Sequence, residues 1–545
     1  MINQEFKTNL KWNIKTDADF ESSIEVFIEE LFLLIRTKIL LKDGDPRKSK
    51  ICWFSPLSFT TASKRSYTDL WNKYSKQILK FSENNIYSLT ESEAPYYFLF
   101  GNATITKPKS VLTMDIGGGS TDIMLFEDTK PVLGTSVHFG ANVIWGNGFS
   151  SFLSEKSNGI YLALKDQIST NLNGTELKKA NEDYCSAESN FAGSDEIINF
   201  WIANDSLTDV ISKLNKGNFR LTYLLHLSAL IYHNLKIIKF KNRIPPTCVI
   251  FSGNGSRYID LIHDASCIEK IWGYFARKIF GENISNPQVI LPLENRKEAT
   301  CYGGLLKPPA NSSFDVENYL GFEAPGEKYE RYRDIEINAN TVFKKTLGAF
   351  NEFVAWFFEM NDTNELNFRN EFGIEIKLNP LKKFILEKAE ENLNMGYYKR
   401  LELVDKDDLI SDSIFYYPLV GLIYRINKLS ADEINNLVGK TIYYLNGPDG
   451  EKEFLISQAA LQIMSDSLYT ITIENDSPNT GVLNIIDNPT FQKRALAAYQ
   501  GFINPVCSYE NFPQPNQLIK TINSGKVRKE GDKWIITEKI KIEFV

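Results

Sequence analysis

The chain lacks an apolar run long enough to cross a bilayer, which takes about 20 consecutive residues. Its most apolar stretches, residues 31–35 and 414–424, are too short for that. Residues 1–16 are polar and lack the apolar centre of a secretory signal. We therefore expect no membrane span and no signal peptide.

Closely spaced cysteines are also missing. The six cysteines never form a CxxC pair and are far apart: Cys52, Cys185, Cys248, Cys267, Cys301 and Cys507. Most of them lie in apolar or helical surroundings, where a reduced and buried thiol is the usual state. This cysteine usage favours a reducing, cytoplasmic compartment.

An excess of positive charge is missing as well. The formal net charge is −7 and no basic patch stands out, so neither nucleic acid nor an anionic membrane is an expected partner. The densest basic stretch, residues 526–533, is interrupted by Glu530 and Asp532. It predicts a solvated hairpin.

Two kinds of catalytic or metal site find no support. No GxSxG motif is present, so the nucleophile elbow of a serine hydrolase is not expected. His226 and His233 are seven residues apart in an apolar segment that has no acidic companion. They are therefore expected in the core or at its edge rather than at a metal.

Hydrophobic periodicity predicts alternating strands and helices in the first part of the chain. Residues 17–41 have apolar positions at three- and four-residue steps, among them Phe27 and Leu34. Further helices are predicted at 60–81, 94–100, 221–240, 267–280 and 298–306, and strands at 49–55, 86–89, 110–114, 122–126 and 247–251. This order is typical of an α/β layer.

The carboxyl-terminal part has a different character. A polar stretch at 171–195 predicts an insertion, and the segment PPANSS at 308–313 predicts a linker. Beyond it, helices are predicted at 341–360 and 380–392, a buried segment at 415–427, strands at 441–445, 469–474 and 534–545, and a hairpin turn at 446–450. The sequence thus predicts an α/β domain over residues 1–307 and an α+β domain over residues 308–545.

The strongest chemical signal is SVLTMDIGGGSTDIMLFE at residues 110–127. A buried strand ends at Asp115, three glycines follow, and a second apolar strand returns. Glycines let main-chain N–H groups approach phosphate oxygens, and successive N–H groups form an anion-binding nest. An aspartate at this point can hold a water bound to Mg²⁺. The alternative is an ordinary glycine-rich hairpin turn.

The second signal is TCVIFSGNGSRY at residues 247–258. A strand runs into a glycine turn, and Ser256 and Arg257 could open a helix whose amino terminus suits a phosphate or nucleoside. A guanidinium plane such as that of Arg257 can stack on a purine. By itself this pattern is common in α/β folds.

Taken in order, these segments resemble the ATPase domain shared by actin, DnaK-type heat-shock chaperones and sugar kinases. DIGGGSTD at 115–122 looks like the second phosphate loop of that family, and SGNGSR at 252–257 is similar to its adenosine motif. Gly140 followed by alanine resembles the glycine pair after the loop. ICWFSPLSFTTASKRS at 51–66, Glu91 and EATCYGG at 298–304 are similar to further family segments. The resemblance spans residues 17–307.

The resemblance implies a two-lobed, ribonuclease-H-like domain that binds ATP and Mg²⁺. It implies that Asp115 orders a metal-bound or attacking water and that Glu91 positions the water for attack. The implied phosphate-binding residues are Gly117, Gly118, Gly119, Ser120 and Thr121, with Gly140 nearby. The implied adenosine-binding residues are Gly253, Asn254, Gly255, Ser256 and Arg257.

Three departures separate the chain from that family. The family's first phosphate loop has no counterpart, because the segment before Asp17 contains no glycine. The charged helix residues that line adenine in chaperones are not matched, and residues 308–545 do not resemble the chaperones' substrate-binding part.

Several functions therefore stay open. The leading hypothesis is a Mg²⁺-dependent ATPase whose lobe closure controls a partner protein held by the carboxyl-terminal domain. The alternatives are a filament-forming bacterial actin-like protein and a degenerate, non-hydrolysing nucleotide-binding scaffold. A small-molecule kinase ranks last, because no residue set specifies a sugar or acetate.

Overall fold

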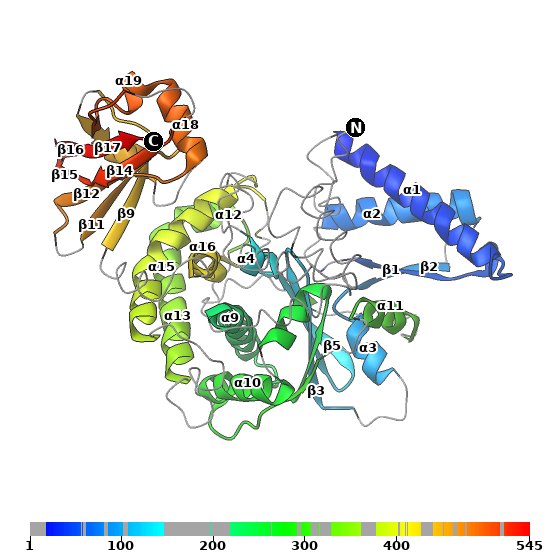
Figure 1. Cartoon of the computed structure of the whole chain (residues 1–545). Coiled ribbons are helices and arrows are strands. Elements are labelled where there is room, and N and C mark those ends of the chain that lie inside the picture. Colours follow the sequence, from blue (N-terminus) through cyan, green and yellow to red (C-terminus); the bar gives the residue numbers. More distant parts are fainter. Residues whose placement is uncertain are drawn as a thin grey trace, which may run out of the picture. The chain divides into compact units, whose positions relative to one another are not determined.

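The structure is a computed structural model with mixed α/β secondary structure (Figure 1). It describes residues 18–55, 57, 61–80, 85–101, 107–146, 198, 218–262, 264–291, 296–306, 315–316, 329–360, 378–401, 404–408, 410, 413–426, 440–450, 452–460, 466–474, 477–512 and 517–545. The insertion predicted at 171–195 and the linker predicted at 308–313 lie outside these residues.

The chain forms two compact units. The first comprises Met1–Trp145, Ala163–Ile374 and Leu401–Tyr416, and the second comprises Gly146–Leu162, Glu375–Arg400 and Tyr417–Val545. These units do not follow the predicted boundary between residues 307 and 308. Each unit is described by itself below.

A six-stranded sheet forms the centre of the first unit, in the order β7-β6-β3-β4-β5-β8. The strands are β3 (Ser110–Ile116), β4 (Thr121–Glu127), β5 (Lys130–Val137), β6 (Cys248–Ser252), β7 (Gln288–Ile290) and β8 (Asp315–Val316). β3, β4 and β5 are antiparallel neighbours, whereas β6 runs parallel to β3. β3, β4 and β6 are almost wholly buried, as continuous apolar strands are when both sheet faces are covered. β5 was not predicted from the sequence.

Long helices accompany this sheet. They are α9 (Asn218–Phe240), α10 (Ala265–Phe280) and α13 (Ala339–Glu359). Shorter helical elements are α4 (Asn142–Trp145), η5 (Asn254–Leu261), α12 (Tyr332–Ile337) and η7 (Ile414–Tyr416). The rings of Tyr232 in α9 and Phe353 in α13 lie 5.6 Å apart, and the Tyr232 hydroxyl donates a hydrogen bond to Glu352. This packing explains why α13 belongs to the first unit.

Two short helices from distant parts of the sequence cross closely. They are α3 (Ala94–Phe100) and α11 (Arg296–Leu306). A Cβ on Gly303 would lie only 1.9 Å from the Ala94 carbonyl oxygen, so the crossing requires glycine there. Tyr96 of α3 stacks on Phe126 of β4 with ring centroids 4.0 Å apart, which fixes the pair against the central sheet.

A smaller layer of the first unit contains β1 (Ile51–Ser55) and β2 (Ile86–Thr90), which pair in parallel. Its other elements are α1 (Ala18–Leu40), η1 (Pro46–Lys48), α2 (Thr61–Tyr74) and the π-helical turn η2 (Ser75–Leu79). All the strands and helices predicted up to residue 90 are confirmed. Within the described residues β1 and β2 form a two-stranded sheet of their own, separate from the six-stranded sheet.

The second unit contains α15 (Leu378–Leu401), α16 (Tyr417–Ile426) and a β-rich part. A six-stranded antiparallel sheet has the order β10-β16-β15-β12-β11-β9, and a three-stranded sheet has the order β13-β17-β14. The strands are β9 (Lys440–Leu445), β10 (Glu453–Leu455), β11 (Tyr469–Glu474), β12 (Thr480–Ile485), β13 (Cys507–Ser508), β14 (Ile519–Asn523), β15 (Gly525–Glu530), β16 (Lys533–Glu538) and β17 (Ile540–Phe544). Short helical elements are η8 (Ile456–Gln458), α18 (Pro489–Ala497) and α19 (Tyr499–Phe502).

Hairpin predictions in this part met different outcomes. The hairpin at 526–533 is confirmed by the β15–β16 pair, whose turn has Gly531 at φ 63°. The hairpin at 446–450 is wrong, because β9 and β10 lie at opposite edges of the six-stranded sheet. After β10 the chain returns to pair Ala460 with Tyr444 of β9, so the sheet curls and its edges approach each other.

Among the described helices, none is both long and apolar enough to cross a membrane.

Candidate functional site

The predicted phosphate loop closes a β-hairpin. β3 ends at Ile116 and β4 begins at Thr121, and these two residues pair. The loop is pinned at its base, where the Gly117 N–H donates to the Ser120 carbonyl at 2.8 Å. Gly119 is exposed, and a Cβ there would meet no atom within 4 Å. The apex of the loop therefore faces open space.

The direction of the peptide groups in this loop follows from two hydrogen bonds. The Ala141 N–H donates to the Gly117 carbonyl at 3.0 Å, and the Asn142 N–H donates to the Gly118 carbonyl at 2.8 Å. No described peptide is cis, and in a trans peptide the carbonyl and the N–H point in opposite directions. The N–H groups of Gly118 and Gly119 therefore both point away from Ala141 and Asn142.

Neither of these two N–H groups makes a hydrogen bond within the described part of the chain. Adjacent main-chain amides that point the same way from a turn form an anion-binding nest. The carbonyl side of the loop is thus hydrogen-bonded to the protein, whereas the N–H groups of Gly118 and Gly119 on the other side are not.

The segment after β5 supports the loop from its carbonyl side. A Cβ on Gly140 would lie 2.4 Å from the Gly118 carbonyl oxygen and 2.7 Å from the Ser120 nitrogen, so this approach requires glycine. Thr121 is fully buried, and its hydroxyl donates to the Phe139 carbonyl at 2.8 Å. Gly140 and Thr121, which the resemblance placed at the cofactor, therefore have supporting contacts behind the loop.

The second glycine turn leaves the same edge of the sheet. β6 runs parallel to β3 with Ser252 opposite Asp115, and parallel neighbours end at a common edge. Gly253 has φ +79°, which favours glycine. A Cβ there would also lie 2.4 Å from the Ile116 carbonyl oxygen.

The two glycine turns are in direct contact. A Cβ on Gly255 would lie 2.3 Å from the Gly117 carbonyl oxygen. The structure thus brings together the two predicted motifs, which are far apart in the sequence.

The second turn continues as the 3₁₀ helix η5 from Asn254, two residues before the predicted helix start. The Ser256 hydroxyl donates back to the Gly253 carbonyl at 2.7 Å and is buried. Asn254 and Arg257 are half-buried. Their side chains are therefore the ones in this turn that remain accessible to a ligand.

Asp115 lies at the floor between the turns. Its side chain is half-buried, and one carboxylate oxygen accepts a 2.8 Å hydrogen bond from Ser252. The other oxygen would be 2.7 Å from a Cβ on Gly253. Within the described residues no group of three or more His, Cys, Asp or Glu side chains could enclose a metal ion. Asp115 therefore suits a water-mediated contact to Mg²⁺ rather than a closed metal site.

The turn that carries Glu91 lies along β3. The Glu91 N–H donates to the Ser55 carbonyl at 3.2 Å, and the carbonyl of Ser92 accepts a 2.6 Å hydrogen bond from Thr113. Thr113 and Asp115 are two residues apart on one strand, so their side chains share a face of the sheet. The structure thus places the Glu91 turn beside the face that holds Asp115.

The second aspartate of the motif, Asp122, had no predicted role. Asp122 pairs with Asp115 across the hairpin but is only 3% exposed. Its carboxylate accepts hydrogen bonds from the Ser136 hydroxyl and, at 3.3 Å, from the Leu57 N–H. Asp122 therefore joins the hairpin to the segment that follows β1. The sequence contained one signal for this role, because a hairpin closed by the three glycines places Asp122 opposite Asp115.

His226 links the two sides of the site. It is fully buried, as predicted, and stacks on Phe139 with ring centroids 4.3 Å apart. Its Nε2 lies 3.1 Å from the Gly140 carbonyl and its Nδ1 lies 2.8 Å from the Tyr258 hydroxyl. A carbonyl only accepts, so Nε2 donates and Nδ1 accepts. Burial lowers the pKa of His226 to about 3, against smaller raising effects of backbone hydrogen bonds.

No protein-family model matches the sequence, and no curated protein matches it. Solved structures do align. MreB5 of Spiroplasma citri bound to ADP is 14% identical over 52% of this chain and 74% of that chain, with a TM-score of 0.24. An archaeal actin homolog is 14% identical over 50% of this chain and 74% of that chain, with a TM-score of 0.27. A ROK family glucokinase from Streptomyces griseus in complex with glucose and AMPPNP is 13% identical over 43% and 70%, with a TM-score of 0.20.

These neighbours are proteins of the actin-like ATPase fold, the superfamily that the sequence motifs resemble.

Proposed function

We propose that the hairpin loop binds the phosphates of ATP together with Mg²⁺. The observation that carries this proposal is the pair of uncommitted N–H groups of Gly118 and Gly119, which point to the same side of an exposed loop. Such a nest supplies partial positive charge to phosphate oxygens. Asp115, at the end of the strand that leads into the loop, receives a water of the hydrated metal.

The second turn supplies the nucleoside side of the proposed site. Gly253 and Gly255 allow its backbone to contact the phosphate loop. Asn254 and Arg257 are the accessible side chains there, and a guanidinium plane stacks on a purine. We assign Ser256 to the support of the turn, because its hydroxyl is committed to the Gly253 carbonyl.

Hydrolysis is the next step of the proposal. Glu91 lies in the turn fixed beside β3, and a carboxylate there orients water for in-line attack on the terminal phosphate.

The test is isothermal titration with ATP and with ADP, each with and without Mg²⁺, on the wild type and on Gly119→Ala. The added methyl group meets no protein atom but occupies the space that a phosphate would take. We expect about tenfold weaker binding, which corresponds to about 1.4 kcal/mol. Gly348→Ala is the matched control, because a Cβ there also meets nothing within 4 Å and the residue lies in α13.

The outcomes separate the hypotheses. Wild-type protein that binds neither nucleotide contradicts the proposed function. Binding with phosphate release that Glu91→Gln abolishes supports an ATPase, whereas binding without release identifies the non-hydrolysing scaffold.

We further propose that the bound nucleotide controls an interaction of the protein with a partner protein or with further copies of itself. Sedimentation of the full chain with ATP, ADP or neither distinguishes nucleotide-dependent assembly from a nucleotide-dependent grip on a partner.

A further inference from the structure

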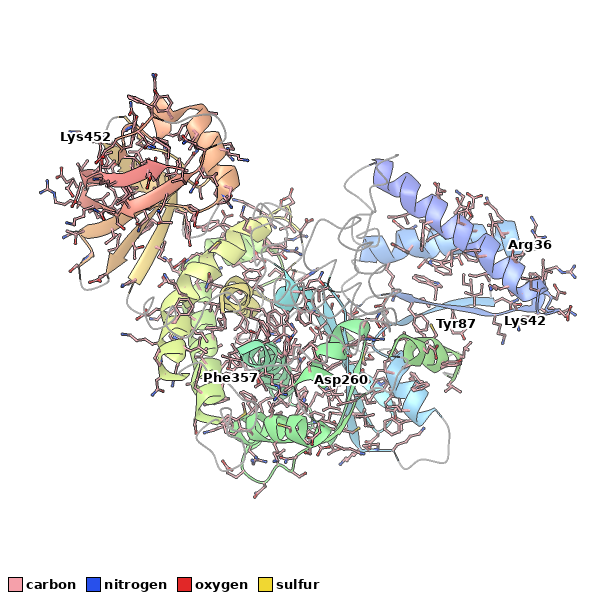
Figure 2. All side chains as sticks on the ribbon, viewed as in Figure 1. Arg36, Lys42, Tyr87, Asp260, Phe357 and Lys452 are labelled. Atoms are coloured by element: carbon pink, nitrogen blue, oxygen red, sulfur yellow. The ribbon has the colours of Figure 1, made fainter. Side chains whose placement is uncertain are left out.

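Helix α1 carries an exposed apolar stripe. Six apolar residues, five in the helix and one directly after it, are between 43% and 72% exposed. They form two series at intervals of seven residues: Val26, Leu33 and Leu40, and Phe27, Leu34 and Leu41. We call this set the outer stripe. An interval of seven keeps side chains on one side of a helix, as in helices that pack lengthwise on one another. Figure 2 shows α1 with Arg36 and Lys42 labelled near its carboxyl end.

The opposite side of α1 is already covered. Ile24, Ile28 and Phe32 are buried and pack with Tyr74 and Leu79. Phe27 and Leu34, which belong to the apolar periodicity that predicted this helix, are both more than half exposed. A surface helix normally has a single apolar face. A second exposed apolar face marks a contact surface.

Charges beside the outer stripe define the orientation of a partner. Glu29 and Arg36 are both exposed and are seven residues apart, so they lie on the same flank of the stripe. When two such helices pack antiparallel, equivalent flanks face each other. Glu29 of each copy then meets Arg36 of the other, and the twofold symmetry forms the ion pair twice.

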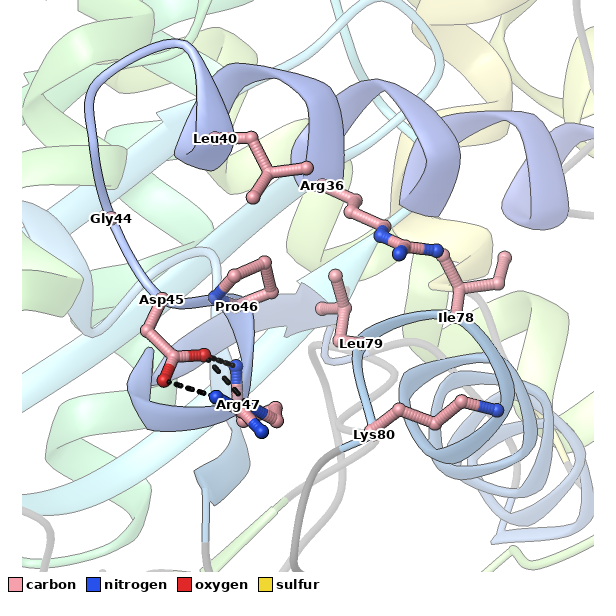
Figure 3. Close-up of a pocket in the computed structure, with 9 residues that line it drawn as sticks. All are labelled: Arg36, Leu40, Gly44, Asp45, Pro46, Arg47, Ile78, Leu79 and Lys80. Atoms are coloured by element: carbon pink, nitrogen blue, oxygen red, sulfur yellow. Dashed lines mark hydrogen bonds and ion pairs between the residues drawn. The ribbon is translucent and has the colours of Figure 1, made fainter.

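A cavity on the Arg36 flank has a charge opposite to that of Glu29. It has a volume of about 470 Å³ and lies between the end of α1 and the η1 and η2 turns (Figure 3). Arg36, Arg47 and Lys80 line it, while Asp45 is its one acidic lining residue. Asp45 is itself paired with Arg47 at 3.0 Å. The cavity is therefore net positive and suits an approaching carboxylate.

From these features we propose that a second copy of this chain packs its α1 antiparallel against the outer stripe. Leu33 and Leu34 lie at the middle of the contact, and Glu29 of each copy enters the basic cavity beside Arg36 of the other. Glu30 and Thr37, also seven residues apart, interrupt the stripe. Polar residues in such a seam set register at a cost in stability, so the dimer is concentration-dependent.

The experiment is sedimentation velocity of the full chain over a range of concentrations, with charge-reversed variants. Glu29→Arg alone and Arg36→Glu alone each place like charges at both symmetric contacts. We expect roughly tenfold weaker dimerisation for each. An equimolar mixture of the two variants restores opposite charges at both contacts and is expected to dimerise like the wild type.

Two controls separate this interface from general effects. Lys344→Glu makes the same charge change as Arg36→Glu at an exposed residue of α13, outside the stripe, and is expected to leave dimerisation unchanged. Leu34→Asp in the stripe abolishes the dimer, whereas Ile337→Asp, at a residue 78% exposed outside the stripe, does not.

Three results would overturn the proposal. One is a monomer at every concentration. Another is a dimer that is insensitive to Leu34→Asp or is not restored in the mixed sample. The third is a monomer that sediments with phosphatidylglycerol vesicles through the stripe, which would make lipid its occupant. None of these readouts depends on nucleotide binding.

Discussion

Gly255 lies so close to Gly117 that a Cβ on Gly255 would come within 2.3 Å of the Gly117 carbonyl oxygen. The contact joins two turns that follow the neighbouring parallel strands β3 and β6. In the same trans peptide the Gly118 N–H points away from the Gly117 carbonyl. The contact therefore lies on the carbonyl side of the loop and does not occupy its amide side. The proposed nucleotide site depends on this arrangement.

Gly253→Ala should destabilise the protein and weaken nucleotide binding. The substitution forces a side chain into φ +79° and against the Ile116 carbonyl oxygen, at an expected cost of about 1–3 kcal/mol. Urea unfolding and titration with ATP measure the two effects. Gly281→Ala is the matched control, since Gly281 has φ +114° but no atom within 4 Å of its Cβ. Equal effects of the two substitutions would show that the close approach to Ile116 is unimportant.

Ser252→Ala should weaken Mg²⁺-dependent nucleotide binding with little loss of stability. The variant removes the 2.8 Å hydrogen bond that orients the Asp115 carboxylate, a contact worth about 1 kcal/mol. The measurement compares ATP affinity with and without Mg²⁺. Ser266→Ala removes a similar serine–aspartate hydrogen bond, to Asp264 at 2.7 Å, outside the proposed site. Unchanged Mg²⁺ dependence in Ser252→Ala would contradict the role assigned to Asp115.

The two aspartates of the hairpin should respond differently to alanine. Asp122→Ala leaves the buried Leu57 N–H without its acceptor, so the free energy of unfolding should fall by about 1–3 kcal/mol. Asp115 is half-buried, and Asp115→Ala should instead lower nucleotide affinity with a smaller effect on unfolding. Paired unfolding and binding measurements on both variants test this division. The reverse pattern would mean that the roles have been exchanged.

Stability should fall in acid because of His226. Burial lowers its folded pKa to about 3 from the ordinary 6.5, so the unfolded chain binds a proton throughout that range while the folded chain does not. The free energy of unfolding contributed by this group is complete above pH 6.5. It is lost as pH falls toward 3, by at most about 1.4 kcal/mol per pH unit.

His226→Gln removes this titration. Urea unfolding at several pH values between 7 and 5 should show a shallower loss for the variant than for the wild type. Parallel pH profiles for the two proteins would contradict a buried, neutral His226.

Local patterns were sufficient to predict much of the secondary structure. Three glycines between two apolar strands identified the hairpin loop, and Gly253 and Gly255 identified the second turn. Glycine patterns of this kind predict turns because they reflect the backbone requirements of a few neighbouring residues. Helix α1 could be predicted from its local periodicity. Its buried side could not be predicted, since two of its faces are apolar.

The pairing of strands far apart in the sequence could not be predicted. The turn after Leu445 contains strong hairpin residues, yet β9 and β10 lie at opposite edges of their sheet. Similarly, β1 and β2 pair only with each other among the described strands. Which strands become neighbours depends on side-chain burial over the whole sheet, and local propensity does not encode it.

The sequence by itself identified the segments to which we assign nucleotide binding: Asp115, the three glycines after it and the turn that begins at Gly253. Only the tertiary structure decided that these segments touch, that Asp122 is a buried support while Asp115 remains accessible, and that His226 connects Gly140 to Tyr258. The physical reason is that amide direction, burial and hydrogen-bond partners are fixed by contacts between residues far apart in the chain.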